Sequence, residues 1–467
     1  LQADVQGLGE VVVIGYGTQK KSDLTGSVAS VKATELRALP QTTVTQALQG
    51  RAPGVQVTQN SGAPGGPVTV RIRGGNSILG GNNPLYVVDG FALSGTPSAL
   101  NPADVESIEI LKDASATAIY GSRGANGVIL VTTRRGKAGQ GRFDVESYYA
   151  TQRVIKEIPL LNAREFAEIA NERAVNDGQA PYFTPAQVEA FGEGTNWQRE
   201  LFRPAPMQNH VLTFSGGSDK LQYSASVNYL QQGGVVLGSD YWKAGARANI
   251  NHQVTRRLGL TYSLVLSRTN RQVVSGENSS RGDGVTSAVL VAPPTVPPLD
   301  ADGNYSNVVP YAFSPNVLRN PLALAREVSN RSLRDYALAN IGLNYELLDG
   351  LTLRSTVGIE SDKTKGDFYS SRKLTDLTPT GAASQSYADQ LNVLNENTLT
   401  YARTFAKDHA FTLLGGFTYQ NQTNQNFGAS ATGFANDNLE NYALQAGSVP
   451  GAPSSGYSDW TLLSYLG

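Results

Sequence analysis

The stretch LQYSASVNYLQ, residues 221–231, alternates between apolar and polar side chains with a period of two. Its apolar odd positions are Leu221, Tyr223, Ala225, Val227 and Tyr229, and Gln, Ser and Asn lie between them. This period indicates a β-strand with one apolar and one polar face. Such a strand needs an apolar medium over one face, so the question is whether that medium is protein or lipid.

The same alternation returns in residues 242–250, 258–266 and 337–347. Each segment has about 10 residues, the span of a tilted membrane strand. The connections are short turns on one side and long polar segments on the other. The turns lie at 216–220, 254–257, 347–350 and 405–408, and the long segments at 153–206, 270–332, 363–390 and 424–457. This asymmetry is typical of up-and-down outer-membrane barrels, whereas a soluble sandwich has moderate loops at both ends.

The composition agrees with a membrane strand protein. Charged residues make up 16% of the chain, against about 25% in soluble domains. Tyr and Trp residues near the strand ends fit interfacial aromatic girdles, although aromatic residues are also common in ordinary strands. We therefore predict that the odd positions of 221–229 face lipid and that the Ser and Asn face points into a wet lumen.

Several functional classes find no support in the sequence. There is no Cys, which excludes disulfides, thiolate catalysis and zinc–thiolate sites. The three His residues, His210, His252 and His409, are far apart and lack metal-ligand spacing. The net charge of −1 gives no reason to expect a nucleic-acid partner. We expect no enzyme activity, no cofactor and no metal, and no apolar run reaches the ~18 residues of a membrane helix.

Residues 1–136 have a different pattern, that of a compact mixed α/β domain. A helical stretch is predicted at 43–54, followed by strands at 55–59, 68–74, 84–90 and 107–113. Asp113 is placed to cap the N-terminus of a short helix from Ala114 to Tyr120, and Gly121 to end it.

Four segments of this region carry a family resemblance. They are EVVVIGYGTQKKSDLTGSVASV, GRAPGVQVTQNSGAPGGPVTVRIRGGNS, NNPLYVVDGF and NPADVESIEILKDASATAIYGSRGANGVILVTTRRGK, all within residues 10–137. In this order they resemble the plug domain of SusC/RagA-type TonB-dependent transporters. The resemblance implies an α+β plug followed by a transmembrane antiparallel β-barrel of about 22 strands, of which about ten are expected here.

The resemblance also implies an organisation and a function. Residues 1–17 would be an N-terminal TonB-box segment, 18–136 the plug domain, and 137–467 the N-terminal part of the barrel with long extracellular loops. The expected function is TonB-dependent import of a glycan or oligopeptide across the outer membrane of a Gram-negative bacterium. The implied partners are TonB, with ExbB/ExbD as energy source, a SusD-like surface lipoprotein and outer-membrane lipid. A siderophore or cobalamin receptor, or a barrel with a structural or secretion role, remains the alternative.

Two groups of site residues follow. The resemblance places the TonB-binding segment at Glu10, Val11, Val12, Val13, Ile14, Gly15 and Tyr16. A β-branched extended run of this kind can add to a partner's sheet edge, or be a plain first strand of the plug. In residues 68–73, Arg71 and Arg73 lie on the polar face and are predicted to pair with carboxylates of the barrel wall, unless they are simply solvated.

Two further expectations concern the loops and the wall. In residues 196–202, Trp197, Arg199 and Phe202 offer a surface for a sugar or peptide, although packing within the loop is the favoured interpretation. A barrel of ~8 to 10 strands leaves space for little more than side chains. We therefore expect an open arc around the plug, with unpaired edge strands near 142–152 and 458–467 and the remaining strands beyond Gly467.

Overall fold

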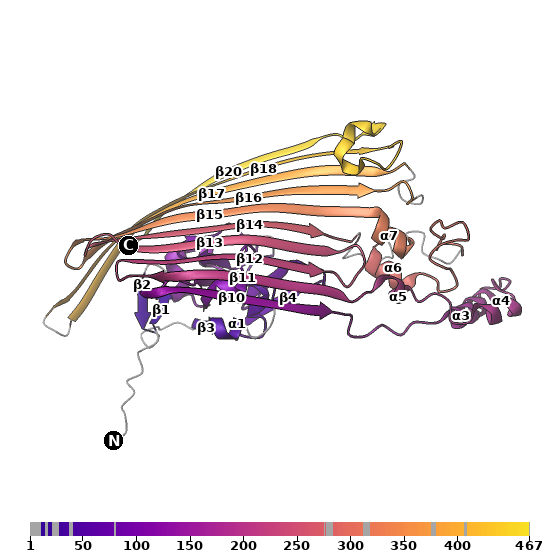
Figure 1. Cartoon of the computed structure of the whole chain (residues 1–467), viewed down its shortest axis with the longest axis horizontal. Helices are drawn as coiled ribbons and strands as arrows, with labels where there is room; N and C mark the ends of the chain where they lie inside the picture. Colours follow the sequence, from indigo (N-terminus) through magenta and orange to yellow (C-terminus); the bar gives the residue numbers. More distant parts are fainter. Residues whose placement is uncertain are drawn as a thin grey trace, which may run out of the picture.

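The structure, a computed structural model, has two parts: a mixed α/β plug and a long antiparallel sheet that curves over it (Figure 1). It describes residues 11–14, 17–20, 28–36, 41–78, 81–274, 276, 284–311, 318–374, 380–405 and 409–466. The chain thus keeps the two-part organisation expected from its sequence: an α+β plug and then a partial antiparallel barrel wall.

The plug is built around a five-stranded sheet. Its strands, in spatial order, are β3 (Val28–Lys32), β8 (Val105–Leu111), β9 (Val128–Thr133), β6 (Leu85–Val88) and β7 (Phe91–Ala92). Only β6 and β9 run parallel. A separate pair is formed by β4 (Val55–Gln59) and β5 (Val68–Ile72). The helices are α1 (Ala33–Leu36) and α2 (Ala114–Thr117), with 3₁₀ turns η2 (Gln46–Leu48), η3 (Pro102–Asp104) and η4 (Ala118–Gly124).

The core of the plug comes from continuous apolar runs in its central strands. Ile108, Ile110 and Leu111 of β8 and Val128 and Ile129 of β9 are completely buried. A fully buried side chain of this size contributes about 1.5–3 kcal/mol relative to an exposed one. A strand that is buried on both faces has a continuous run of apolar residues in its sequence, not an alternation of apolar and polar ones. This is why the plug and the wall look different in sequence.

The helical predictions for the plug were too long. In place of a helix over 43–54 there is only the 3₁₀ turn η2. The predicted helix 114–120 ends at Thr117 and continues as 3₁₀ structure, with a kink at Gly121, where φ is 56°. Asp113 does occupy the cap position, but its side chain makes no cap hydrogen bond. Its carboxylate instead lies 2.5 Å from Arg73 Nη1, an ion pair that sequence spacing does not reveal.

The wall is an 11-stranded antiparallel sheet in which each strand from β10 to β18 pairs with the next strand in sequence. Its strands are β10 (Gly139–Gln152), β11 (Ala205–Gly217), β12 (Leu221–Gly233), β13 (Asp240–Gln253), β14 (Leu258–Gln272), β15 (Val328–Leu348), β16 (Leu351–Ser370), β17 (Ala382–Phe405), β18 (His409–Thr432), β19 (Val449–Pro450) and β20 (Ser454–Leu466). The short β19 and the long β20 both pair with β18. This confirms the expectation of about ten long strands in up-and-down order.

Strands β15 to β18 are longer than their sequence pattern predicts, with 20 to 24 residues each. The predicted loop at 363–390 is therefore wrong over most of its length, and the predicted loop at 424–457 is wrong over its first nine residues. Residues 363–370, 382–390 and 424–432 continue the strands. Their side chains are mostly small or polar, so the alternation of apolar residues stops although the backbone ladder continues. The alternation of apolar and polar residues reveals a strand only where one face of that strand is apolar.

The long connections carry helices at one end of the sheet. These are α3 (Ala163–Asn176), α4 (Pro185–Phe191), α5 (Trp197–Leu201), α6 (Val285–Val291), α7 (Pro321–Glu327) and the 3₁₀ turn η5 (Glu440–Ala446). Figure 1 shows α3 and α4 projecting beyond the strand ends, opposite the end that carries the short turns. Both begin at capping boxes, Asn162 with Glu165 and Thr184 with Gln187. No helix in the described ranges is long and apolar enough to span a membrane.

The wall does not close on itself. Over the described residues, β10 pairs only with β11, and β20 pairs only with β18. The plug lies against the concave side of this open arc (Figure 1). The predicted edges near 142–152 and 458–467 are thus confirmed.

The two faces of the strands also follow the prediction, with one correction. In β12, Val227 is 52% exposed on the outer face, whereas Ser224 and Ser226 are 2% and 3% exposed on the inner face. The prediction of a wet lumen behind these serines is wrong, because the plug occupies it. Ser226 Oγ donates a hydrogen bond to Asp104 of the plug.

Candidate functional site: the contact between plug and wall

The contact between plug and wall contains buried charges. On β13 the inner positions carry Lys243, Arg247 and Asn249, which are 0%, 3% and 5% exposed. Alternation with the outer residues Ala244, Ala246 and Ala248 forces these polar groups inward. A charge removed from water is costly unless it is paired or hydrogen-bonded, so its partners define the site.

Arg247 of the wall binds the plug at the end of its last strand, β9. Its Nε lies 3.3 Å from Asp104 Oδ1, and the two side chains are 1% and 3% exposed. Its Nη1 donates to Thr133 Oγ1 at 3.0 Å and to the carbonyl of Arg134 at 2.8 Å. One guanidinium group thus joins the wall to two plug segments, the turn before β8 and the end of β9.

Lys243 holds two other segments through backbone oxygens. Its Nζ donates to the carbonyls of Leu100 at 3.1 Å, Ser98 at 3.3 Å and Thr42 at 3.5 Å. An ammonium group has three donors, and here each donor meets one carbonyl. Because the acceptors are backbone atoms, the contact depends on where the plug chain runs and not on which side chains it carries.

A third contact centres on Glu360 of β16, which is 3% exposed. Its Oε2 accepts from the backbone N–H of Ser94 at 2.9 Å and from Asn392 Nδ2 at 3.0 Å. Its Oε1 accepts from the hydroxyl of Tyr336 at 3.0 Å. Beside it, a Cβ at Gly358 would lie 2.5 Å from the ring of the fully buried Phe91. Glycine at this position therefore lets the plug approach the wall closely.

The network continues from Asn392 to the plug. Gln420 Nε2 donates to Asn392 Oδ1 at 2.8 Å, and Arg123 of the plug donates to Gln420 Oε1. Arg123 Nη2 also lies 3.7 Å from Glu396. The plug is thus tied to β16, β17 and β18 by one connected chain of polar side chains.

Two more arginines of the wall reach plug segments near the loop end of the sheet. Arg334 pairs with Asp362, with Nε 2.7 Å from Oδ1, and it also donates to Ser98 Oγ. Arg271 Nε donates to the carbonyl of Pro64 at 3.0 Å. Four basic side chains on β13, β14 and β15 therefore bind plug carbonyls, hydroxyls or a carboxylate. They are Lys243, Arg247, Arg271 and Arg334.

This contact is suited to being made and broken. A hydrogen bond to a charged group adds about 1.5–3 kcal/mol net, and water can replace both partners once the contact opens. Apolar wall residues also join the plug core, namely Val265, Tyr336, Leu338 and Leu394. A cavity of about 690 Å³ lies between plug and wall. Asp89 and Arg135 of the plug and Arg354 and Glu396 of the wall are among the residues that line it.

The structure places the two predicted plug arginines elsewhere. Arg71 Nη1 donates to Asn83 Oδ1 at 2.5 Å, and Arg73 pairs with Asp113 and with the carbonyl of Lys112. All these partners belong to the plug, whereas the sequence predicted that Arg71 and Arg73 pair with carboxylates of the wall. The arginines that do cross the interface are mainly those of the wall, reaching inward. Burial and the nearby Arg73 lower the pKa of Lys112 in the same corner.

The predicted TonB-binding segment is partly described. Glu10, Gly15 and Tyr16 lie outside the described residues. Residues Val11–Ile14 form strand β1, which pairs antiparallel with β2 (Gly17–Lys20). In the described part of the chain this hairpin is a sheet of two strands, and Figure 1 places it at the end of the molecule that carries the short turns.

Other candidates resolve into structural roles. Trp197 is 3% exposed, and its Nε1 donates to the carbonyl of Pro293 at 3.1 Å, so it packs within the loops. Arg199 lies 3.4 Å from Glu157. In the plug, burial raises the pKa of Glu109, partly offset by a hydrogen bond from Ser107. No group of three or more His, Asp and Glu residues in the described ranges is arranged to hold a metal.

The polar residues of the interface were missed by sequence reasoning, although part of the signal was present. Alternation assigns Lys243 and Arg247 to the inner face of their strand. A charged residue on the inner face of a filled barrel must meet a partner, and this identifies it as a contact to the plug. The partner itself, Asp104 or a carbonyl, comes from sequence positions more than 100 residues away, which one sequence cannot pair.

Comparison with known proteins agrees with this architecture. The TonB-dependent Receptor Plug Domain family matches residues 20–128. TonB-dependent receptor P3 of Formosa agariphila is 39% identical over 472 residues, covering 100% of this chain and 45% of the relative. TonB-dependent receptor SusC of Bacteroides thetaiotaomicron is 32% identical over 395 residues, covering 77% of this chain and 37% of SusC.

Solved structures give the same answer. The RagAB peptide importer in its open-open state matches with a TM-score of 0.85 and 27% identity, over 98% of this chain and 54% of that one. The ferric citrate transporter FecA shares the fold alone, at a TM-score of 0.55 and 12% identity. The chain spans about half the length of the curated relatives it matches. With its plug and the strands that follow, it belongs to the SusC/RagA type of TonB-dependent receptors.

Proposed function

We propose that the whole protein imports a glycan or an oligopeptide across the outer membrane, with energy delivered by TonB and ExbB/ExbD. The observation that carries this proposal is the buried polar contact between plug and wall. Lys243, Arg247 and Glu360 bind groups that water can also bind, so the plug can be displaced and reseated. A purely structural or secretory barrel has no evident need for such a contact.

The TonB end of the mechanism rests on the hairpin β1–β2. Strand addition requires an edge with free N–H and C=O groups. In the described residues β1 pairs with β2 alone, which leaves its other edge for a partner strand. The hairpin precedes β3, an edge strand of the plug sheet. Tension applied at β1 would therefore reach the plug along the chain at β3.

The substrate end lies at the long loops, where a SusD-like lipoprotein would cover the mouth. A bound substrate changes the exposure of the TonB segment only if it binds two plug states with different affinity. Arg271 and Arg334 hold plug segments at this end through Pro64 and Ser98. Substrate contact with these segments is the route by which occupancy reaches the plug.

Both substrate classes stay in the proposal. Similarity to a peptide importer at 27% identity supports oligopeptides. Similarity to SusC at 32% identity supports the same transporter type but names no substrate. The ferric citrate transporter FecA and FpvA bound to pyoverdines share only the fold, at 12% and 11% identity, so they give the siderophore alternative no further support.

The test is uptake by cells that carry the full-length gene with its neighbouring lipoprotein gene. Labelled oligosaccharides and oligopeptides above porin size are offered in separate assays, with a strain lacking TonB as control. Import of one class that needs the receptor, the lipoprotein and TonB supports the proposal. Import that persists without TonB, or uptake of ferric chelates alone, contradicts it.

A further inference from the structure

The cavity between plug and wall lies toward the end of the molecule that carries the short turns. It reaches from Asn340 in β15 to Gly350, in the turn between β15 and β16. The plug borders it with the β6–β7 turn, at Asp89 and Gly90, and with the second half of β9. Its volume of about 690 Å³ falls within the range of about 300–1,000 Å³ that is usual for ligand pockets.

The wall side of this cavity is hydrophilic and carries few charges. Inner positions of β15, β16 and β17 supply hydroxyl and amide groups, among them Asn340, Asn344, Thr352, Thr356 and Thr398. The charged wall residues in the lining are Arg354 and Glu396. Asn340 is 5% exposed, and its Nδ2 has no hydrogen-bond partner among the described residues, as expected beside a polar space that water fills. Such a lining can bind a hydrophilic solute weakly at many points.

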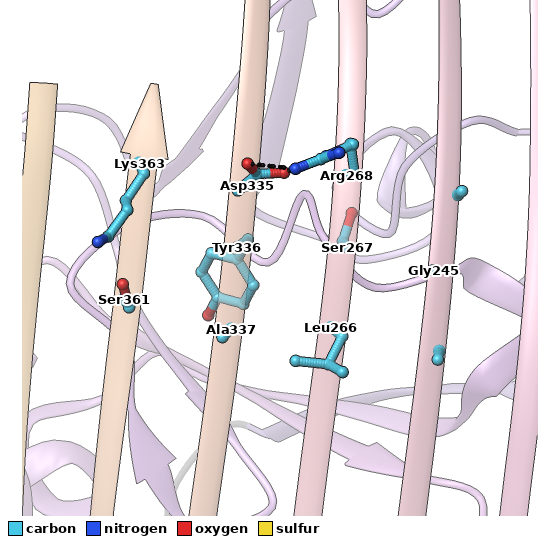
Figure 2. Close-up of a pocket in the computed structure, with 11 residues that line it drawn as sticks. Gly245, Leu266, Ser267, Arg268, Asp335, Tyr336, Ala337, Ser361 and Lys363 are labelled. Atoms are coloured by element: carbon cyan, nitrogen blue, oxygen red, sulfur yellow. Dashed lines mark hydrogen bonds and ion pairs between the residues drawn. The ribbon is translucent and has the colours of Figure 1, made fainter. Parts of the chain in front are cut away.

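The outer face of the neighbouring strands is hollowed as well, around Leu266 (Figure 2). The charged residues there pair with one another. Arg268 makes two hydrogen bonds to Asp335, and Lys363 Nζ lies 3.4 Å from Asp389. This hollow is separated from the plug by the sheet itself, so a solute that has entered the lumen cannot use it. The inner cavity is the one that bears on transport.

One small hairpin of the plug closes the inner cavity on the side of the long loops. Phe91 of β7 is completely buried and packs on Gly358 of β16, where a Cβ would lie 2.5 Å from the ring. Asn392 Nδ2 of β17 donates to the carbonyl of Ala92 at 3.5 Å. Gly358 is the register partner of Asn340. The hairpin therefore touches the wall in the row at which the cavity begins.

This hairpin is weakly attached to the rest of the plug. In the described residues β7 is an edge strand of the plug sheet and pairs with β6 through two residue pairs. Segments with few backbone hydrogen bonds open more readily than central strands. On the β12–β13 side the contacts continue to the end of the plug: Arg247 binds the carbonyl of Arg134, and a Cβ at Gly136 would clash with the backbone of Tyr223. A passage on the β14–β17 side thus needs the smaller displacement.

We propose that the transported solute passes the plug on its β14–β17 side. The β6–β7 hairpin moves away from Gly358, and the solute enters the cavity and leaves it at the end that carries the short turns and the hairpin β1–β2. The cavity is thus a transit site for a hydrophilic chain, with Thr356 and Thr398 among the wall residues that bind it in passing. This inference rests on the proposed function, import of a glycan or an oligopeptide, and adds the route.

The test introduces single thiols into the full-length receptor, with any Cys outside this chain replaced by Ser, since this chain has none. Thr356→Cys lies in the cavity. Ser215→Cys is the matched control, because it is also a half-buried inner position but lines a separate pocket of about 350 Å³ between the plug and β10–β11. Intact cells are treated with a bulky methanethiosulfonate that still crosses porins. Uptake is then measured for the oligosaccharide or oligopeptide that the unaltered receptor imports.

The bulky label on Thr356→Cys should abolish uptake, and reductant should restore it. A methyl label at the same position should be tolerated, and the bulky label on Ser215→Cys should leave uptake unchanged. Three results would overturn the route: uptake that persists with the bulky label on Thr356→Cys, an equal block from Ser215→Cys, or no labelling of Thr356→Cys in a strain that lacks TonB. In each case the unlabelled receptor still imports. Failure of the unaltered receptor to import either class contradicts the proposed function instead.

A second variant tests the hairpin as the closure. Phe91→Ala removes the ring from Gly358 and should let a thiol reagent too large for porins reach Thr356→Cys from outside, in a strain that lacks TonB. Ile110→Ala removes a completely buried side chain from β8, a strand inside the plug sheet, and should leave Thr356→Cys unlabelled. Equal labelling in both variants would mean general loosening of the plug. That result, or no labelling with Phe91→Ala, would contradict the role of the hairpin.

Discussion

At the scale of single residues, the plug is held by a few buried groups whose partners are far away in sequence. Arg247, Lys243 and Glu360 each contact a plug segment that includes backbone atoms. Alternation along β13 was sufficient to place Lys243 and Arg247 on the inner face. It could not reveal that the lumen is filled, so the serines of β12 were wrongly expected to meet water. A strand pattern reports which side is polar, not what covers it.

Replacing Arg247 by Met should loosen the plug. The change leaves Asp104 as a buried carboxylate without its cation, a loss that costs about 3–5 kcal/mol in buried pairs. Hydrogen exchange in the full-length receptor should become faster in residues 102–105 and in β9. Arg257→Met is the matched control. It breaks an ion pair with Asp349 whose side chains are 52% and 91% exposed, and such pairs contribute about 0–1 kcal/mol. Equal protection in both variants would contradict the role of Arg247.

Glu109 predicts a pH dependence of plug stability. Burial raises its pKa above the ordinary 4.5, against an opposing hydrogen bond from Ser107. The folded plug therefore binds this proton more tightly than the unfolded chain does. The stabilisation is fully present below pH 4.5 and is lost as pH rises through the raised pKa.

The corresponding measurement is the stability of Glu109→Gln. This variant should have a more stable plug than the parent receptor at pH 7 and nearly the same stability at low pH. Glu106→Gln, at an exposed position of the same strand, removes a neighbouring negative charge that adds to the raised pKa of Glu109, so it should give a smaller gain over the same pH range. Urea midpoints of the plug amides, read by hydrogen exchange at several pH values, provide the comparison. A gain for Glu109→Gln that does not shrink toward low pH would exclude titration of this group as its origin.

At the scale of elements, the sequence predicted β4, β5, β6 and β8 of the plug and the first strands of the wall, and it missed β3, β7 and β9. The predicted strands have a clear apolar signature, either a largely buried run as in β8 or a strict alternation as in β12. Prediction was poor where polar residues continue a ladder, as in β17, and where turns of 3₁₀ helix replace regular helix, as at η2. In these places long-range pairing or packing decides the structure and local pattern does not.

The two faces of β12 give a test of the wall. Val227→Arg puts a charge on the outer face and should cost about 2–4 kcal/mol if it lies near the bilayer midplane. Ser226→Arg should now be at least as harmful, because Ser226 is 3% exposed and contacts Asp104. Overpacking alone costs about 1–3 kcal/mol. Folding yields in lipid vesicles and urea midpoints would compare the two. A mild effect of Ser226→Arg would mean that the plug does not fill this part of the lumen.

The hairpin β1–β2 carries the prediction about TonB. Deletion of residues 11–17 in the full-length receptor should abolish uptake and leave substrate binding at the cell surface intact. Val12→Pro is a finer variant, because proline removes a backbone donor from an added strand. Val12→Ile keeps the donor and the β-branched shape and should transport normally. Normal uptake after the deletion would reject this segment as the TonB site.

At the scale of the whole molecule, an open wall of 11 strands covers one side of the plug. That the chain cannot encircle the plug followed from strand number alone, because barrel width grows with the number of strands. The number of strands does not predict which residues of the plug contact the wall. The position of the plug depends on contacts between β11 to β18 and plug segments that are more than 100 residues away in sequence, such as the pair Asn101 and Asn209.

This pair gives a direct test of whether the plug must part from the wall during import. Asn101 Nδ2 lies 3.4 Å from Asn209 Oδ1, and both residues are buried. The chain has no Cys, so Asn101→Cys with Asn209→Cys would introduce the only thiols of this part of the receptor. Once oxidised, the pair should fix the turn before β8 to β11 and block uptake, because the plug segment can no longer move away. Reductant should restore uptake, and each single variant should transport at the same rate with and without reductant. Uptake that continues at full rate while the disulfide is intact would show that substrate passes without separation of this contact.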